Sequence, residues 1–280
     1  MLNIEKEKSI LVPFDFTPVG EAALYHANIF AKKLHKNIVL FHVVPTHDQK
    51  EEAMEKLETI AQRNKQAAWI DTFFTVGTGS IFEQIGQAAD LLNSAFVVMG
   101  THGIVGMQKI TGSYALKVIT RSHTPYVVVQ KSLSIPSYNN IIVPINYEPE
   151  SKQPIFHIMN IARTFGSLCH IVYPLSKDDH INNKINNNVS YCLGFLNDNN
   201  IKYKSTCLEG RSSDFNENFL KYAAENNGDL ITLITPQHIS LVEFLLRPAE
   251  QYIIANDNKI PVMCIHPDYT ATKYGSVFAS

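Results

Sequence analysis

Four residues in the middle of the chain have the types and spacing of a phosphate-binding loop. Gly100 and Gly103 are separated by two residues, and Gly112-Ser113 follows after eight more. A backbone can approach a ligand closely at a glycine, and a helix start offers free N–H groups and the positive end of the helix dipole to an anion. The stretch therefore predicts a phosphate cradle closed by a helix that begins near Gly112.

Two further regions that could contact a ligand lie at the ends of apolar segments elsewhere in the first half. Asp15 comes directly after Ser9–Phe14, and Val43 lies near the end of the apolar run 38–44. Short, fully apolar runs are typical of parallel strands that are buried on both faces. Ligands of such sheets bind beyond the carboxyl ends of the strands. Asp15, the His42-Val43 region and the Gly100 loop are therefore expected to converge on one crevice.

The elements that must position these residues alternate regularly. We expect strands at 9–13, 38–44, 68–76, 95–99 and 126–130, and helices at about 17–35, 48–65, 80–92 and 113–121. Thr17-Pro18 has the composition of a helix N-cap followed by a first-turn proline. The alternation predicts βαβ units with right-handed crossovers and a parallel sheet.

The second half of the chain repeats the first. Ile-Leu-Val-Pro-Phe-Asp at 10–15 returns as Ile-Ile-Val-Pro-Ile-Asn at 141–146, and Pro-Tyr-Val-Val-Val at 125–129 returns as Pro-Val-Met-Cys-Ile at 261–265. A repeat of this length predicts two similar domains. We place them at 1–132 and 138–268, followed by a C-terminal tail at 269–280.

The repeat lacks the phosphate-loop residues. Asn146 stands in the place of Asp15, Thr235-Pro-Gln-His in that of the first two loop glycines, and Pro248-Ala in that of Gly112-Ser113. Proline has no N–H to donate, and side chains fill the space that a ligand close to the backbone needs. The second domain is expected to bind no nucleotide in this manner.

Bulk properties favour a soluble, cytoplasmic protein without nucleic-acid or membrane partners. The net charge is −2, and no apolar run approaches the roughly 18 residues of a membrane span. The N-terminal segment lacks the apolar core of a signal peptide. The four cysteines form no C-x-x-C pair and the histidines are scattered, so we expect reduced thiols and no metal site.

With these motifs the chain resembles the universal stress protein family, as a tandem two-domain member, from about residue 5 to 268. The signature of the ATP-binding members has nine residues between its second and third glycines, where this chain has eight. The resemblance implies an α/β fold of two tandem open parallel-sheet domains (Rossmann-like, adenine nucleotide alpha hydrolase-like) with about five strands each. It also implies an intramolecular pseudo-dimer that pairs the fifth strands, 126–130 and 262–265.

The resemblance further implies a site for ATP, alone or with Mg²⁺, in the first domain. Asp15 would bind the nucleoside, the backbone at Val43 the adenine, and the glycine loop with Ser113 the ribose and phosphates. His102 either faces the phosphates or points to water, and the shortened loop either loses a phosphate contact or absorbs the change at Gly106. The expected binding residues are Pro13, Asp15, Val43, Gly100, Thr101, His102, Gly103, Gly112 and Ser113.

The leading functional hypothesis is an ATP-binding stress-response or signalling protein that forms homo-oligomers through fifth strands or domain faces. One alternative is a nucleotide-free dimeric interaction scaffold, and another is a slow ATPase in which Asp15 or His102 activates water. The signatures of adenylating and nucleotidyl-transferring enzymes, His-x-Gly-His and Ser-Gly-Gly-x-Asp, are absent from the sequence. We therefore expect no enzyme activity and no catalytic residue.

Overall fold

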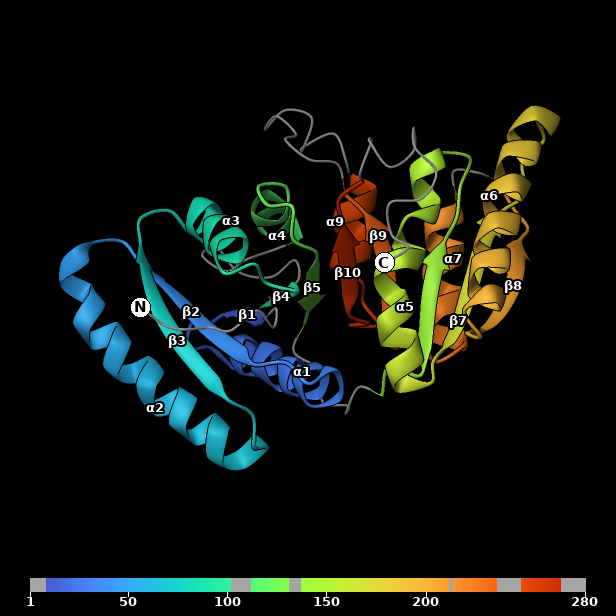
Figure 1. Cartoon of the computed structure of the whole chain (residues 1–280). Helices are drawn as coiled ribbons and strands as arrows, with labels where there is room; N and C mark the ends of the chain where they lie inside the picture. The colour runs from blue at the N-terminus through green and yellow to red at the C-terminus, as the bar shows by residue number, and fades with distance from the viewer. Residues whose placement is uncertain (1–8, 102–111, 131–136, 212–213, 236–247, 268–280) are drawn as a thin grey trace. The chain divides into compact units, whose positions relative to one another are not determined.

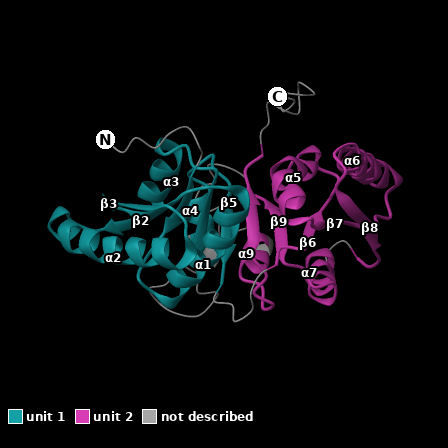
Figure 2. Cartoon of the chain, turned by 60° about the horizontal axis from the view of Figure 1, so that its bottom comes forward, with its two compact units in different colours: residues 1–134, 237–247 teal, residues 135–236, 248–280 magenta. Residues whose placement is uncertain are grey.

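The computed structural model describes residues 9–101, 112–130, 137–211, 214–235 and 248–267. They form two compact units, with the division after residue 134 (Figure 2). Each unit alternates strands and helices around an open parallel sheet, which confirms the predicted α/β class.

The first unit has a five-stranded sheet in the order β3-β2-β1-β4-β5, with every neighbouring pair parallel (Figure 1). Its elements are β1 (Ile10–Pro13), α1 (Pro18–Leu34), β2 (Ile38–Val44), the 3-10 helix η1 (His47–Gln49), α2 (Lys50–Ala68), β3 (Thr72–Thr78), α3 (Ile81–Leu91), β4 (Phe96–Gly100), α4 (Gly112–Ile119) and β5 (Tyr126–Val129).

The register of the central strands sets the place of the candidate site. Pro13, the last residue of β1, pairs with Phe41 of β2, and Leu11 pairs with Val97 of β4. Ile10, Leu11 and Val12 are fully buried, as expected for a strand covered on both faces. The carboxyl ends of β1, β2 and β4 therefore share one edge of the sheet.

Local signals explain where two helices of this unit begin and end. Thr17 caps α1 by accepting a hydrogen bond from the Gly20 N–H at 3.3 Å, with Pro18 in the first turn, as predicted. The expected strand at 68–76 was placed too early, since α2 continues to Ala68 and β3 begins at Thr72. Gln66, Ala67 and Ala68 favour helix, and the residue after them, Trp69, caps the helix with φ 60°.

The second unit has its own five-stranded parallel sheet in the order β10-β9-β6-β7-β8. Counted from the start of each unit, this is the same strand order as in the first unit. Its elements are β6 (Asn140–Pro144), the 3-10 helix η2 (Pro149–Lys152), α5 (Pro154–Phe165), β7 (Leu168–Pro174), α6 (Asp179–Asp198), β8 (Lys202–Leu208), α7 (Phe215–Glu225), β9 (Leu230–Ile234), α9 (Pro248–Ile254) and β10 (Val262–Ile265).

Candidate functional site

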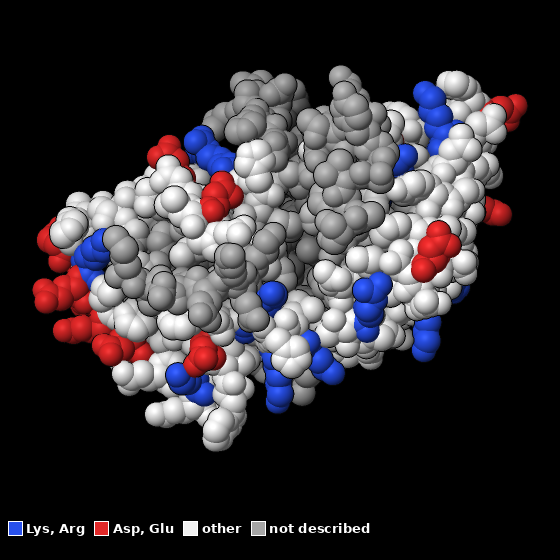
Figure 3. All heavy atoms as spheres, in the orientation of Figure 1, with Lys and Arg blue, Asp and Glu red and all other residues white. Residues whose placement is uncertain are grey.

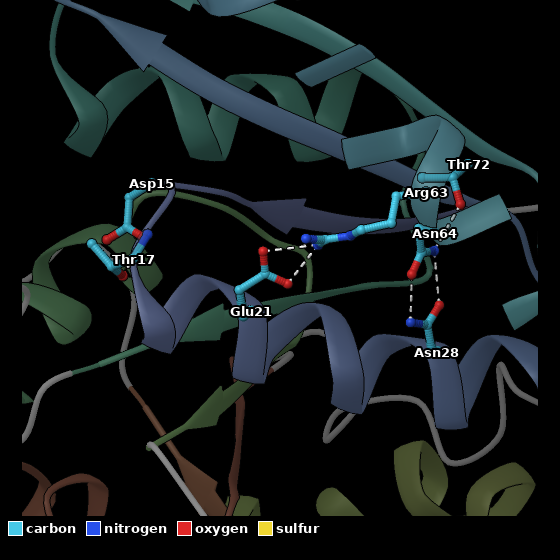
Figure 4. A network of polar contacts seen from close by, with 7 residues as sticks. All are labelled: Asp15, Thr17, Glu21, Asn28, Arg63, Asn64 and Thr72. Atoms are coloured by element: carbon cyan, nitrogen blue, oxygen red, sulfur yellow. Dashed lines mark hydrogen bonds and ion pairs between the residues drawn. The ribbon is translucent and has the colours of Figure 1, made fainter. Parts of the chain in front are cut away.

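Asp15 lies in the turn between β1 and α1, where hydrogen bonds fix one of its carboxylate oxygens (Figure 4). Oδ1 accepts from the Thr17 N–H at 3.1 Å and from the Thr17 hydroxyl at 2.5 Å. The side chain is exposed, and Oδ2 accepts no hydrogen bond from the residues that the structure describes. The carboxylate is thus held in place with one oxygen left to accept from a ligand.

Gly20 allows the first turn of α1 to approach this carboxylate. A Cβ atom at Gly20 would lie 2.7 Å from Asp15 Oδ1, which is closer than real Cβ atoms come to other heavy atoms. Gly20 was not among the predicted site residues. Its signal in the sequence is a glycine in the first turn of a helix, where it costs helix stability without an evident reason.

Gly100 is required by packing at the end of β4. A Cβ atom at Gly100 would overlap Val19 Cγ1 and lie 2.6 Å from the Val19 carbonyl oxygen, so α1 passes directly over this glycine. Val19 precedes Gly20 in the chain. Asp15, the start of α1 and Gly100 therefore form one contiguous group at the carboxyl edge of the sheet.

The end of β2 joins this group through His42. His42 Nδ1 is 2.7 Å from the Phe14 carbonyl oxygen, which links the ends of β1 and β2. The ring of Phe16 packs against His42, with 4.8 Å between ring centroids. Phe16 was not predicted as part of the site, whereas His42 was expected there together with Val43. Val43 follows His42, is half-buried, and pairs with Gly77 of β3.

Of the remaining predicted site residues, the structure describes some fully, some only in their backbone, and some not at all. Pro13 is half-buried at the end of β1. Thr101 is completely buried, and its N–H donates to the Val129 carbonyl at 2.8 Å, so that N–H is already used. His102 and Gly103 lie outside the described residues. Helix α4 begins at Gly112 and includes Ser113, as predicted, although the side chains of 112–114 are also outside that description.

Contacts between α1 and α2 support the site from the side away from β4 (Figure 4). Arg63 of α2 donates to both carboxylate oxygens of Glu21, at 2.7 and 2.8 Å. Asn28 and Asn64 exchange two hydrogen bonds of 2.7 and 2.9 Å, and Asn64 also donates to Thr72 Oγ1 of β3 at 2.9 Å. Helix α1, which carries Val19 and Gly20, is thereby attached to the outer part of its sheet.

On the face that Figure 3 shows, the first unit carries charges of both signs, and acidic side chains gather along α2. Glu51, Glu52, Glu55 and Glu58 of this helix are exposed, and Glu52 forms an ion pair of 2.6 Å with Lys56. Among the described residues, no group of three or more His, Cys, Asp and Glu side chains has the geometry to hold a metal ion. The described helices include none that is long and apolar enough to span a membrane.

At the corresponding edge of the second unit, a side chain from α6 bonds to the loop after β6. Asn188, which is buried, donates from Nδ2 to the carbonyls of Asn146 and Glu148 at 3.0 and 2.9 Å. Asn146 Oδ1 accepts from the Glu148 N–H at 2.8 Å, much as Asp15 accepts from Thr17. The loop that follows β6 is thus tied to a helix of its own unit.

Strand pairing also shifts the alignment of the two halves at the phosphate loop by one residue from the alignment expected from the sequence. In the repeat, Val129 corresponds to Ile265. Gly100 pairs with Val129, and Ile234 pairs with Ile265. The N–H groups of the next residues, Thr101 and Thr235, donate to the carbonyls of those same two partners. Ile234, not Thr235, therefore occupies the position of Gly100. The sequence comparison missed this because it aligned the loops and not the strand ends. An isoleucine there leaves no room for a helix placed as α1 is over Gly100.

Comparison with known proteins agrees with this architecture. Residues 7–130 match the model of the Universal stress protein family. One universal stress protein of Methanocaldococcus jannaschii is 25% identical over 159 residues, covering 45% of this chain and 97% of its own length. Another from that organism is 26% identical over 144 residues, covering 44% of this chain and 82% of its own length.

Solved structures show the same fold over nearly the whole chain. A universal stress protein from Archaeoglobus fulgidus has a TM-score of 0.74 at 16% identity, covering 94% of this chain and 97% of its own. A putative universal stress protein from Pseudomonas aeruginosa has a TM-score of 0.68 at 14% identity, covering 94% of both chains. The family model thus matches the first unit, somewhat less than half of the chain, and the solved structures show that both units together have the fold of universal stress proteins.

Proposed function

We propose that this protein is an ATP-binding stress-response or signalling protein with a single nucleotide site in its first unit. The observation that carries the proposal is the contiguity of Asp15, the start of α1 and Gly100 at the carboxyl edge of the sheet. Ligands of open α/β sheets bind at this edge. Binding, without efficient turnover, is the proposed activity.

The residues present fit the parts of an adenine nucleotide. Asp15 Oδ2 is an acceptor suited to a ribose hydroxyl, and its position is fixed because Oδ1 is bonded to Thr17. Near the ends of β2 and β3, where Val43 pairs with Gly77, the backbone of Val43 would contact the base. The N-terminal turn of α4 would supply N–H groups to phosphates, and ATP would bind alone or with Mg²⁺.

The direct test is the nucleotide content and the binding stoichiometry of the purified full chain. Mass spectrometry of the denatured protein would identify a co-purified nucleotide, and calorimetry would measure binding of ATP, ADP and AMP. We add cAMP to the panel because a universal stress protein has been crystallised in complex with it. We expect one ATP per chain, and two per chain would show that the second unit also binds.

A charge-removing variant tests the role of Asp15. Asp15→Asn keeps one side-chain oxygen to accept from Thr17 but replaces the other oxygen with an NH2 group, which donates and cannot accept, so we expect affinity to fall by about tenfold or more. Asp71→Ala, which removes another exposed carboxylate that pairs with Lys65, should leave affinity unchanged. Equal affinities for the wild type and Asp15→Asn would exclude this role.

The same titrations address the two competing functions. No bound nucleotide and no heat or thermal shift with ATP would refute the proposed function and favour an interaction scaffold. Steady phosphate release that disappears in Asp15→Asn would favour a slow ATPase.

A further inference from the structure

Phe16 adopts a backbone conformation that bulky residues rarely take. Its φ is 60°, in the left-handed region. Most other non-glycine residues with positive φ follow the end of a helix, where this conformation is common: His35, Trp69, Asn93, Asn200 and Asn227. Phe16 instead lies ahead of α1, and a phenylalanine there costs about 1–2 kcal/mol. Asparagine or glycine would make the same turn with less strain.

The strained backbone presents the ring at the candidate site. The Phe16 ring stands edge-on to that of Phe14, with centroids 5.5 Å apart and planes at 88°, and it tilts against the His42 ring at 4.8 Å. His42 is held by the 2.7 Å contact between its Nδ1 and the Phe14 carbonyl. Phe16 nevertheless remains 37% exposed, so part of this ring, which packs on Phe14 beyond the end of β1 and on His42 of β2, is accessible to a ligand.

We propose that Phe16, supported by His42, forms an aromatic ledge that stacks on the base of the bound nucleotide. This inference rests on the proposed function, and it assigns base recognition to a side chain in addition to the backbone at Val43. Phe16 directly follows Asp15, and His42 directly precedes Val43, so the ledge adjoins both expected nucleoside contacts. Stacking of a base on an aromatic ring contributes about 1–3 kcal/mol and favours large flat purines over pyrimidines.

A matched set of variants separates stacking from phosphate binding. Phe16→Asn keeps a residue that tolerates positive φ but removes the ring, and we expect it to weaken ATP binding by about tenfold. Affinity for inorganic tripolyphosphate, which has no base, should stay the same. The control is Tyr147→Asn in the second unit, which should leave ATP affinity unchanged. Tyr147 follows Asn146 as Phe16 follows Asp15, and Tyr147 is 48% exposed.

A fluorescence measurement tests the contact directly. Trp69 is the only tryptophan, and it is 92% exposed, so Trp69→Phe provides a background without tryptophan emission. In that background Phe16→Trp places an indole at the ledge. We expect ATP to quench its emission strongly, CTP to quench it less, and tripolyphosphate to leave it unchanged. Thermal unfolding of each variant would confirm that it is folded.

The outcomes distinguish this inference from the function on which it rests. If wild-type protein binds no nucleotide, the proposed function fails and the ledge fails with it. If the wild type binds ATP but Phe16→Asn binds it equally well, or if tripolyphosphate quenches the Phe16→Trp indole as ATP does, the ledge is refuted while the nucleotide site stands.

Discussion

At the scale of single residues, Gly100 is needed for the packing of α1 on β4, in addition to any role in ligand binding. Because a Cβ atom there would overlap Val19, Gly100→Ala should lower the free energy of unfolding by about 1–3 kcal/mol through overpacking. The control is Gly194→Ala in α6, where nothing lies within 4 Å of an added Cβ, and which should be stabilising by about 0.5–1 kcal/mol. Urea denaturation of both variants measures the difference. An unchanged free energy of unfolding in Gly100→Ala would show that α1 does not pack as closely as the structure indicates.

A second residue-scale prediction concerns His26, which is buried in α1. Burial lowers the pKa of His26 from 6.5 to about 4, because desolvation disfavours the charged imidazolium. The unfolded chain therefore binds this proton at a higher pH than the folded chain does. The stability that neutral His26 provides is fully present above pH 6.5, declines as the pH falls below 6.5, and levels off below about pH 4.

The measurement is a comparison of pH profiles. Between pH 6.5 and 4, the wild type should lose roughly 3 kcal/mol more than His26→Gln, whose side chain does not titrate. The difference between the two profiles removes the contribution of carboxylates that both proteins share. Parallel profiles would mean that His26 titrates normally in the folded state.

At the scale of elements, helix α6 determines how the second unit differs from the first. Asn188→Ala removes two hydrogen bonds to the carbonyls of Asn146 and Glu148, although the single Ser151 hydroxyl proton can still be donated to one of them, with Oγ 3.2 Å from the Asn146 oxygen and 2.8 Å from the Glu148 oxygen. We expect a loss of about 1–2 kcal/mol in the free energy of unfolding. Asn187→Ala, at an exposed position of the same helix, should gain a few tenths from helix propensity. Chemical denaturation of both variants would show whether the loss is specific to Asn188.

Elements are also the scale at which the sequence was most and least informative. The apolar runs predicted β1, β2 and β4 well, because strands buried on both faces have no polar positions to confuse the pattern. The half-exposed edge strand β3 was misplaced, because an apolar residue such as Ile70 fits a helix end and a strand start equally. The Asp15 turn and the His42-Val43 region were anticipated, but the close approach of Gly20 to Asp15 and the packing of the Phe16 ring on His42 were not. Such contacts join positions that no local pattern relates.

At the scale of the whole molecule, the cysteines provide a reporter for one unit. All four belong to the second unit, where Cys169, Cys192 and Cys264 are buried and Cys207 is exposed on β8. Burial raises the pKa of Cys169 and of Cys192 to about 12 and also raises that of Cys264, so these thiols are unreactive in the folded state.

A thiol-labelling experiment follows from this distribution. At pH 8, an aromatic disulfide reagent should label one thiol per native chain and four in denaturant. The slow labelling of the three buried thiols then measures opening of the second unit alone. Cys207→Ser should abolish the fast reaction and leave the slow one unchanged. More than one fast thiol in the native protein would contradict the packing described for this unit.

The contact between Gly100 and Val19 has a consequence for how such chains evolve and are classified. Selection for a folded first unit is enough to retain glycine at this position, whether or not a nucleotide is ever bound. A lineage that lost its ligand would therefore keep the first glycine of the motif, while glycines without a packing partner would drift. The second unit has Ile234 at the equivalent position, so no helix can lie over that residue as α1 lies over Gly100. Classification by glycine motifs would gain accuracy by giving more weight to glycines that packing does not require.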